Sequence, residues 1–322
     1  MKVLVTGIAG QLGYDVMKRL SALNIEAKGV DYQDFDLTDG EAVMAAVRSY
    51  APDAIIHCAA YTAVDRAEQE PEKCAAVNGM GTLNLVRAAL AVDAKLLYVS
   101  TDYVLSGDGD QPYETNAPYG AKNVYGLTKA QGEEAIRSLM TRYFIVRTAW
   151  VFGLNGHNFV KTMLRLGSER SEVKVVGDQF GSPTYTPDLA RLLCDMIQTN
   201  KFGIYHATNE GFCSWAEFAA EIMRQGERNC TVTPIPTSQY PTPAKRPANS
   251  RLSKSSLDRN AFARLPAWQD ALARYMQELA QQLPAAMVPP LGVIEELPMK
   301  ASGKVDRKSL PWPLPVRAAP YG

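Results

Sequence analysis

The feature that most constrains the fold is an alternation of short apolar runs with helical patterns over the first 150 residues. Runs that are apolar throughout are typical of parallel strands buried on both faces, and the helical patterns supply the crossover connections. The expected strands are residues 2–6, 25–30, 53–58, 95–100 and 143–148, and the expected helices are residues 11–22, 39–50, 71–92 and 124–140. Right-handed crossovers then predict an α/β fold with a doubly wound parallel Rossmann sheet.

The second half of the chain is organised differently. After about residue 150 the alternation loosens, with helices expected at residues 186–199, 214–225 and 267–282 and a proline-rich stretch at 233–247. We expect residues 1–150 to form the dinucleotide-binding domain, with some later elements returning to it, and residues 151–282 to form mainly a smaller substrate-binding domain. Residues 283–322 are a proline-rich tail, in which we expect neither long helices nor a central strand.

Composition narrows the classes of partner. Lysine plus arginine and aspartate plus glutamate each number 34, so the formal net charge is zero and gives no reason to expect nucleic acid or an anionic membrane as a partner. The chain has five cysteines, an odd number, and no two of them are spaced as C-x-x-C. This pattern predicts neither a disulfide framework nor a zinc site, and it favours a cytoplasmic protein. No run approaches the roughly 20 apolar residues of a membrane span. A small soluble substrate fits best.

A glycine pattern follows the first expected strand and opens a helix. Gly7 permits a tight turn, Gly10 lets the backbone approach a pyrophosphate, and Gly13 allows close packing of helix on strand. The amides of the first helical turn and the helix dipole favour phosphate charge. The flanking strand and helix make a dinucleotide site the better interpretation than a glycine turn without a ligand.

Asp31 ends the second expected strand about 20 residues later, where a carboxylate accepts hydrogen bonds from an adenosine ribose. It would repel a 2′-phosphate, and no arginine follows it, so NADH is at least as acceptable as NADPH, although Lys28 lies near enough to alter the balance. The alternative is a solvated turn residue. Asp36 and Leu37 are candidates for the adenine side of the site, while Thr38 or Asp39 caps the next helix. Small residues at Ala59 and Ala60 suit close passage of a cofactor.

Three residues at the predicted carboxyl edge of the sheet suggest carbonyl reduction. Tyr125 and Lys129 are four apart on an expected helix, and Thr101 ends the fourth strand. We expect Tyr125 to protonate a ketone oxygen, Lys129 to lower the pKa of that phenol and hold the nicotinamide ribose, and Thr101 to orient the carbonyl. A Y-x-x-x-K pattern alone is common on exposed helices. Its combination with the glycine turn and the strand-terminal threonine favours catalysis.

Several segments together resemble the dTDP-4-dehydrorhamnose reductase family of extended short-chain dehydrogenases/reductases, over about residues 1–282. They are GIAGQLG from Gly7, CAAYTAVDRAE from Cys58, STDYVLSGDG from Ser100, VYGLTKAQGE from Val124, IVRTAWVFG from Ile145, NFVKTMLRLG from Asn158, DQFGSPTYTPDLA from Asp178 and YPTPAKRPANSRL from Tyr240. The resemblance implies reduction of dTDP-4-dehydro-β-L-rhamnose to dTDP-β-L-rhamnose with NADPH or NADH, and it matches Thr101, Tyr125 and Lys129 to the catalytic trio.

The resemblance also implies binding residues. The cofactor set adds Gln11, Leu12 and Tyr61 to Gly7, Gly10, Gly13, Asp31, Asp36, Leu37, Ala59, Ala60, Tyr125 and Lys129. The substrate set comprises Thr62, Val64, Thr101, Asp102, Tyr103, Trp150 and Arg246, with Arg246 meeting the diphosphate. Trp150 as core packing is an equal alternative. Some members form magnesium-linked dimers, so a homodimer is one expectation, but no match here places metal ligands and we predict no required metal.

The tail resembles a different family. The segment from Glu296 to Pro311, ELPMKASGKVDRKSLP, is similar to the end of nonribosomal peptide synthetase adenylation domains, in which the lysine matching Lys304 contacts the acyl adenylate. Only about 35 residues match, without the large subdomain that binds ATP. We therefore expect this tail to be non-functional alone.

Three other functions compete with the reductase. A non-catalytic regulatory subunit is one, although Thr101, Tyr125 and Lys129 are all retained. A tailoring ketoreductase of a peptide synthetase pathway is another, and its only motivation is the tail. An epimerase or dehydratase would need a further acid/base pair; Glu68 and Glu114 are the candidates, and solvated glutamates are the better interpretation.

Overall fold

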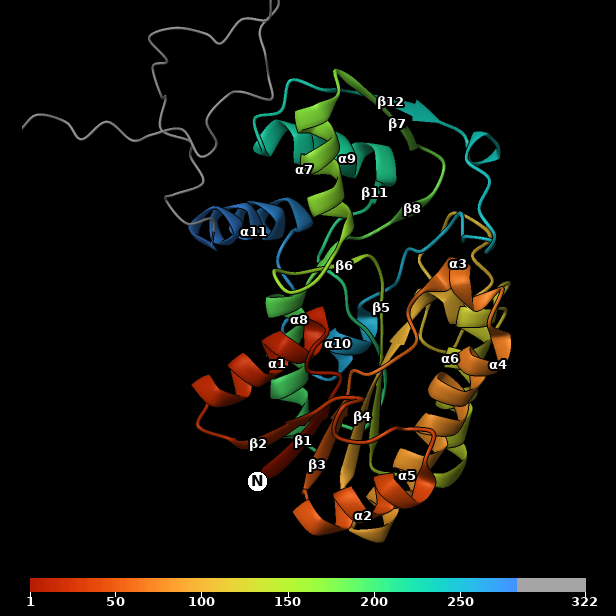
Figure 1. Cartoon of the computed structure of the whole chain (residues 1–322), viewed down its shortest axis with the longest axis vertical. Helices are drawn as coiled ribbons and strands as arrows, with labels where there is room; N and C mark the ends of the chain where they lie inside the picture. Colours follow the sequence, from red (N-terminus) through yellow and green to blue (C-terminus); the bar gives the residue numbers. More distant parts are fainter. Residues whose placement is uncertain (283–322) are drawn as a thin grey trace, which may run out of the picture. The chain divides into compact units, whose positions relative to one another are not determined.

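A parallel sheet of six strands forms the centre of the computed structural model, which describes residues 1–282 (Figure 1). The strand order is β10-β5-β4-β3-β1-β2, and each neighbouring pair is parallel. The strands are β1 (Lys2–Thr6), β2 (Glu26–Val30), β3 (Ala54–His57), β4 (Lys95–Thr101), β5 (Tyr143–Thr148) and β10 (Gly203–His206). The doubly wound Rossmann sheet expected from the apolar runs is therefore confirmed.

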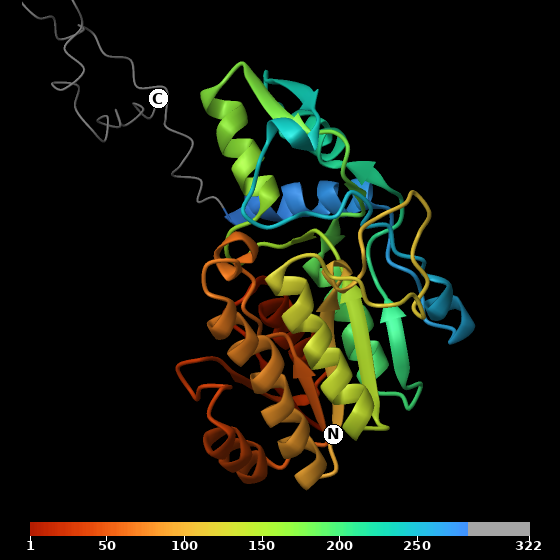
Figure 2. The ribbon, with the colours of Figure 1, turned by 90° about the vertical axis from the view of Figure 1, so that its right-hand side faces the viewer.

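Helices cover both faces of the sheet, as Figure 2 shows from the side. One face carries α1 (Gln11–Ala22) and α8 (Thr186–Ile197), and the other carries α2 (Gly40–Tyr50), α5 (Thr82–Ala91) and α6 (Val124–Leu139). Side chains alternate between these faces along each strand: Leu97 of β4 packs towards α1 and α8, whereas Leu96 packs towards α2 and α5. Burial on both faces explains why these strands are apolar throughout.

The helix expected at residues 71–92 is divided into three parts. They are α4 (Pro71–Ala75), a π-helical stretch η1 (Ala76–Gly81) and α5. Asn78 is buried inside the π-helical stretch, where its side chain accepts a hydrogen bond from Tyr61 N at 2.8 Å and donates one to Thr128 at 3.1 Å. The wider turn thus sends a polar side chain to the segment that follows β3, which apolar periodicity does not predict.

A smaller group of elements lies beyond the carboxyl ends of the strands (Figure 1). It contains three two-stranded pairs, β6 with β9, β7 with β12 and β8 with β11, and an aromatic core in which Phe218 contacts both Phe152 and Phe159. Its elements are β6 (Val151–Phe152), α7 (Phe159–Glu169), β7 (Glu172–Val176), β8 (Phe180–Gly181), β9 (Thr184–Tyr185), β11 (Cys213–Ser214), α9 (Trp215–Gln225), β12 (Thr231–Ile235), η3 (Thr237–Gln239) and α11 (Trp268–Gln282). Three short helices complete the fold: α3 (Val64–Ala67), η2 (Asp102–Val104) and α10 (Ser255–Arg259).

The chain crosses between the two groups more than once. After β6 and β9 it returns to the sheet, where α8 packs on α1 and β10 adds the outer strand next to β5. A compact unit spans Met1–Met276. Across residues 1–282 no helix combines the length and the apolar character needed to cross a membrane.

Candidate active site

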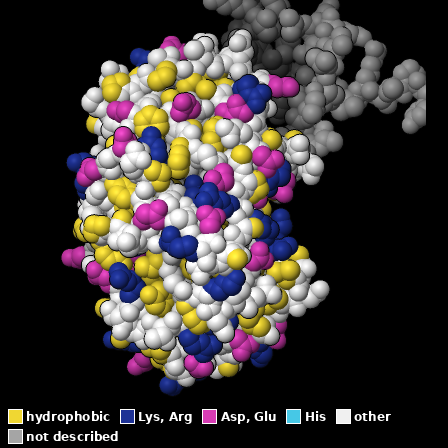
Figure 3. Space-filling model, turned by 180° about the vertical axis from the view of Figure 1, so that it is seen from behind, with side chains coloured by type: hydrophobic (Ala, Val, Ile, Leu, Met, Phe, Trp, Pro, Cys, Tyr) yellow, Lys and Arg dark blue, Asp and Glu magenta, His cyan; other side chains and the backbone are white. Residues whose placement is uncertain are grey.

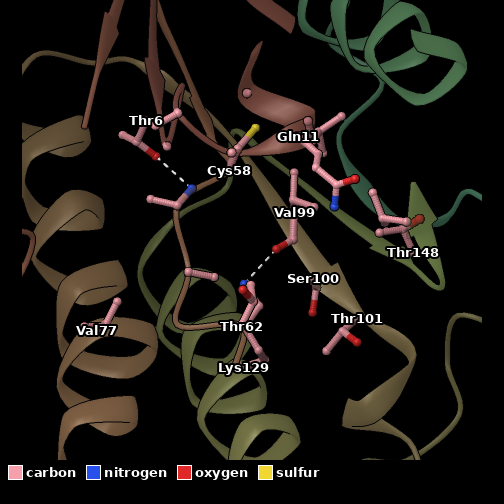
Figure 4. A pocket seen from close by; sticks show the side chains of 18 of the residues that line it. Thr6, Gln11, Cys58, Thr62, Val77, Val99, Ser100, Thr101, Lys129 and Thr148 are labelled. Carbon is pink, nitrogen blue, oxygen red and sulfur yellow. Dashed lines mark hydrogen bonds between the residues drawn. The ribbon is translucent and has the colours of Figure 1, made fainter. Parts of the chain in front are cut away.

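A cavity of about 790 Å³ opens at the carboxyl ends of β1, β3, β4 and β5. Most of the predicted site residues line it, and Figure 4 shows Thr62, Thr101 and Lys129 around the same space. The predicted residues in its wall are Gly7, Gly10, Gln11, Leu12, Gly13, Asp31, Asp36, Leu37, Ala59, Ala60, Thr62, Val64, Thr101, Asp102, Tyr103, Tyr125, Lys129 and Trp150. Two predicted residues, Tyr61 and Arg246, are not in this wall.

The glycine turn has the shape that a phosphate site needs. Gly7 has φ +74°, and a side chain there would bring its Cβ to 2.7 Å from the backbone of Ala59. A side chain on Gly13 would clash with the carbonyl of Gly7. Gly10 precedes α1, whose first turn has no side-chain cap and no acidic residue. The amides of that turn therefore remain available to an anion, and a dinucleotide pyrophosphate fits this cradle.

Asp31 is fixed by the backbone around it. Its carboxylate accepts hydrogen bonds from Ala9 N and Tyr32 N, each at 2.8 Å. Asp31 thereby lies in the cavity wall beside the glycine turn. Lys28 does not line the cavity, and its ammonium lies 5.8 Å from the ring centroid of Tyr50. The part of the wall that would face an adenosine ribose is thus acidic.

Asp36 and Leu37 continue the wall on this side. The Asp36 carboxylate accepts a hydrogen bond from Thr38 N at 2.8 Å, and hydrogen bonding from Thr38 lowers the pKa of Asp36. Asp39 caps α2 by accepting from Glu41 N and Ala42 N. Within this short loop, Asp36 and Leu37 therefore line the cavity, and Asp39 caps the helix.

The segment after β3 brings small residues to the cavity. Ala59 N donates to the hydroxyl of Thr6 at 3.2 Å, which holds the segment against β1 (Figure 4). Tyr61 is directed elsewhere: its hydroxyl donates to Glu70 at 2.8 Å. Its assignment to the cofactor therefore has no support from side-chain position.

Thr101, Tyr125 and Lys129 meet at one end of the cavity. The Thr101 hydroxyl donates to Asp102 at 3.0 Å, and the ring of Tyr125 packs edge-on against Tyr103 with centroids 5.6 Å apart. The Lys129 ammonium donates to Val99 O at 2.7 Å and lies 3.9 Å from the ring centroid of Tyr98. All three catalytic candidates are thus brought together from β4 and α6.

The electrostatics differ from the sequence-based expectation in one respect. Burial raises the pKa of Tyr125 well above its ordinary value, and the Thr101 hydroxyl opposes that rise by hydrogen bonding. Burial also lowers the pKa of Lys129 to about 7, against the attraction of Glu133. Since the ammonium is bound to Val99 O, it does not lower the pKa of the phenol in this arrangement.

Asp102 lies behind Thr101 and is almost fully buried. Its carboxylate accepts hydrogen bonds from Ser250 at 2.5 Å and from Thr101. Burial raises the pKa of Asp102 to about 6, although these hydrogen bonds act in the opposite direction. Asp102 therefore connects the catalytic end of the cavity to the segment that follows η3.

Trp150 combines the two roles that the sequence left open. It adopts a positive φ of +51°, lines the cavity, and stacks on Trp215 with centroids 3.7 Å apart. Arg246 borders a small adjoining recess with Tyr103 and Lys245, and it forms a bidentate ion pair with Asp65 at 2.8 and 2.9 Å. In this structure the guanidinium is therefore paired with a carboxylate of α3.

The cavity also contains residues that the motif analysis missed. Thr148 ends β5 directly opposite Thr101 in the parallel register, and His157 lines the cavity together with Gly156. Thr148 follows the same strand-end signal that identified Thr101. Glu68 and Glu114 lie outside the cavity wall; Glu68 accepts from Val124 N, and Glu114 accepts from Ser255. Over the described part of the chain, no cluster of three or more His, Cys, Asp or Glu residues is arranged to hold a metal.

Comparison with known proteins identifies the family. The model described as "RmlD substrate binding domain" matches residues 1–281. The chain is 38% identical over 293 residues to a dTDP-4-dehydrorhamnose reductase of Escherichia coli, covering 87% of this chain and 98% of that protein. A crystal structure of a dTDP-4-dehydrorhamnose reductase from Clostridium acetobutylicum superposes with a TM-score of 0.85 at 40% identity, covering 87% of this chain and 100% of the other.

A third comparison includes a cofactor. The dTDP-4-dehydrorhamnose reductase of Bacillus anthracis was solved in complex with NADP. It superposes on this chain with a TM-score of 0.84 at 40% identity, and the match covers 86% of this chain and 99% of the other. The segment resembling an adenylation domain lies outside the described residues. Given the family match over residues 1–281 and the agreement in fold, this chain belongs to the dTDP-4-dehydrorhamnose reductase family.

Proposed function

We propose that this chain reduces the 4-keto group of dTDP-4-dehydro-β-L-rhamnose, using NADPH or NADH, to give dTDP-β-L-rhamnose. The observation that carries the proposal is the convergence of Thr101, Tyr125 and Lys129 in one cavity with the uncapped glycine turn. The named relatives support the substrate, and the complex of the Bacillus anthracis relative with NADP supports the cofactor.

The reaction adds a hydride to the ketone carbon and a proton to the ketone oxygen. A bound dihydronicotinamide supplies the hydride. The Tyr125 phenol gives its proton to the oxygen, and the Thr101 hydroxyl hydrogen-bonds that oxygen and orients it. The high pKa of the phenol suits an acid that stays protonated until negative charge develops on the substrate. The product is a secondary alcohol, and the phenolate is reprotonated from solvent.

Lys129 serves the same step from the same face of α6. Its ammonium lies in the cavity wall one helical turn from Tyr125. Released from Val99 O, the ammonium would stabilise the phenolate that forms when Tyr125 loses its proton. A dinucleotide ribose next to the ammonium would compete with Val99 O for its hydrogen bonds.

The substrate is assigned to the side of the cavity formed by Thr62, Val64, Tyr103 and Trp150. Residues 151–282, the proposed substrate-binding domain, would add Val151, Gly156 and His157 of the cavity wall. Arg246 would meet the diphosphate by exchanging Asp65 for the ligand. These roles rest on position in the cavity and on the family.

The proposal extends to the cellular compartment, the partners and the oligomeric state of the protein. None of the five cysteines forms a disulfide, which supports a reducing, cytoplasmic compartment. Figure 3 shows basic and acidic side chains intermixed on one face, consistent with the zero net charge and with a partner other than nucleic acid. A homodimer is a further proposal, which light scattering coupled to size-exclusion chromatography tests.

The direct test is turnover of the keto sugar generated in situ from its dTDP precursor, followed by loss of the absorbance of NADPH or NADH and by NMR of the product. Wild-type chain and a truncation after Gln282 are compared. We expect dTDP-rhamnose from both. A folded wild-type chain that forms no dTDP-rhamnose refutes the proposal, and the regulatory subunit becomes the better interpretation. Turnover lost only on truncation would favour the synthetase-linked ketoreductase.

A further inference from the structure

A buried ion pair lies directly behind the catalytic residues. Glu133 of α6 is 0% exposed and Arg147 of β5 is 1% exposed. Arg147 Nε donates to Glu133 Oε1 at 2.9 Å, and Arg147 Nη2 donates to Glu133 Oε2 at 2.7 Å. Two charges removed from water in this way are costly unless their geometry and remaining hydrogen bonds are nearly complete.

Neighbouring groups complete those hydrogen bonds. Ser100 donates to Glu133 Oε1 at 2.5 Å, and the Tyr119 hydroxyl donates to Oε2 at 3.0 Å. Arg147 also donates to Thr115 O at 3.2 Å. The carboxylate therefore joins α6 to β4, to β5 and to the loop that precedes α6.

On β4 and β5 the residue that follows each partner of this network lines the cavity, and on α6 a cavity residue lies one turn from Glu133. Ser100 precedes Thr101, Arg147 precedes Thr148, and these residues pair across β4 and β5 in the same order. Because successive side chains point to opposite faces of a sheet, Ser100 and Arg147 meet α6 while Thr101 and Thr148 face the other side. Glu133 itself lies one turn beyond Lys129. Movement of the pair would consequently move both halves of the catalytic arrangement.

Glu133 is also the carboxylate that acts most strongly on the buried ammonium of Lys129. Burial lowers the pKa of Lys129 to about 7, and attraction by Glu133 is the largest influence opposing this. The other groups that contact or act on the ammonium are the ring of Tyr98 on β4, His57 and Cys58 at the end of β3, and Cys74 on α4. Cys58 has its pKa raised to about 12 by burial and His57 has its pKa lowered to about 3, so both are neutral near pH 7.

We propose that Glu133, clamped by Arg147, is a positioning residue for the reduction: it fixes the turn of α6 that carries Lys129 against the strand that carries Thr101, and it supplies negative charge to the ammonium. Glu133 is absent from the cavity wall, so it would act on the reaction through the residues that it holds. The kinetic consequence rests on the proposed function. The effect on Lys129 rests on the one-turn spacing of Glu133 and Lys129 along α6 and on the burial of both side chains.

The kinetic test compares the pH profiles of kcat/KM for wild type, Glu133→Gln and Glu133→Gln/Arg147→Met. The double variant removes both charges and avoids leaving a buried guanidinium unpaired. Loss of Glu133 makes the charged form of Lys129 less favourable, so we expect the limb at which activity falls with rising pH to move about one unit to lower pH. We also expect kcat to fall about tenfold, by loss of alignment, with the Kd for the dinucleotide nearly unchanged.

Asp188→Asn provides the control for mere destabilisation. Asp188 is buried and pairs with Arg274 at 2.7 Å, yet it does not line the cavity. We expect it to lower the melting temperature without moving the pH limb. The inference is overturned if both Glu133 variants keep the wild-type limb, or if Asp188→Asn moves the limb equally.

A second measurement is independent of turnover and separates this inference from the proposed function. The unfolding free energies of wild type, Lys129→Met, Glu133→Gln and the corresponding double variant form a double-mutant cycle. We expect non-additivity at pH 6, where Lys129 is charged, and near-additivity at pH 9, where it is neutral. Identical coupling at the two pH values would contradict the electrostatic role even if the chain proves to have another substrate.

Discussion

The buried carboxylate of Asp102 should make the stability of this protein depend on pH in a defined direction. Its pKa in the folded chain is about 6, compared with 3.8 for an ordinary aspartate, because burial disfavours the charged form. The folded state therefore holds a proton between these values that the unfolded state has released. The favourable contribution of Asp102 is fully present below pH 3.8 and is lost as pH rises through 6.

The magnitude follows from the size of the pKa difference. About two pH units at about 1.4 kcal/mol each correspond to an upper limit of about 3 kcal/mol. Asp102→Asn removes the titration while keeping an oxygen that can accept from Ser250. Relative to wild type, the variant should therefore gain up to about 3 kcal/mol in free energy of unfolding between pH 4 and pH 7.

Urea unfolding of both proteins at half-unit intervals of pH measures this difference. Asp110→Asn, a change of an exposed carboxylate in the same part of the chain, provides the baseline. Subtracting two curves cancels the titration of groups that the proteins share. A difference between Asp102→Asn and wild type that stays constant across this pH range would refute the reasoning.

Three further predictions concern ligand binding. Gly13→Ala places a methyl group against the carbonyl of Gly7, so calorimetry should show dinucleotide binding weakened about tenfold, and unchanged affinity would contradict the proposed cradle. Asp31→Ala removes a carboxylate from the ribose side of the cavity, so the ratio of kcat/KM for NADH to that for NADPH should fall about tenfold; an unchanged ratio would remove Asp31 from cofactor choice. Arg246→Ala should raise KM for the sugar nucleotide about tenfold with little change for the dinucleotide, and equal effects on both would argue against a diphosphate contact.

Local signals were sufficient to predict the sheet and most of the catalytic end. The strands at residues 2–6 and 143–148 were predicted with the bounds that the structure has, because apolar runs in a doubly covered sheet leave little ambiguity. The rule that ligands bind at the carboxyl ends of parallel strands placed Thr101 and Tyr125 in one cavity. The glycine turn was recognisable because its backbone requires glycine: Gly7 combines a positive φ with a close backbone approach, and Gly13 lies against the carbonyl of Gly7.

Contacts between distant segments could not be predicted in the same way. Asp65 and Arg246 are separated by 181 residues, and no local pattern indicates that they pair. The direction of the Lys129 ammonium depends on the carbonyl of Val99, which belongs to another element. The π-helical turn at η1 breaks a pattern that reads as one continuous helix. In each case tertiary packing decides a detail that periodicity leaves open.

The most direct test of the account is the rate of keto-sugar reduction by Tyr125→Phe, measured beside wild type with saturating dinucleotide. Phenylalanine keeps the ring that packs on Tyr103 but has no proton to give. The account predicts that kcat falls at least about 100-fold, while dinucleotide affinity and melting temperature stay close to those of wild type. A variant that retains most of the wild-type kcat would contradict the assignment of Tyr125 as the acid.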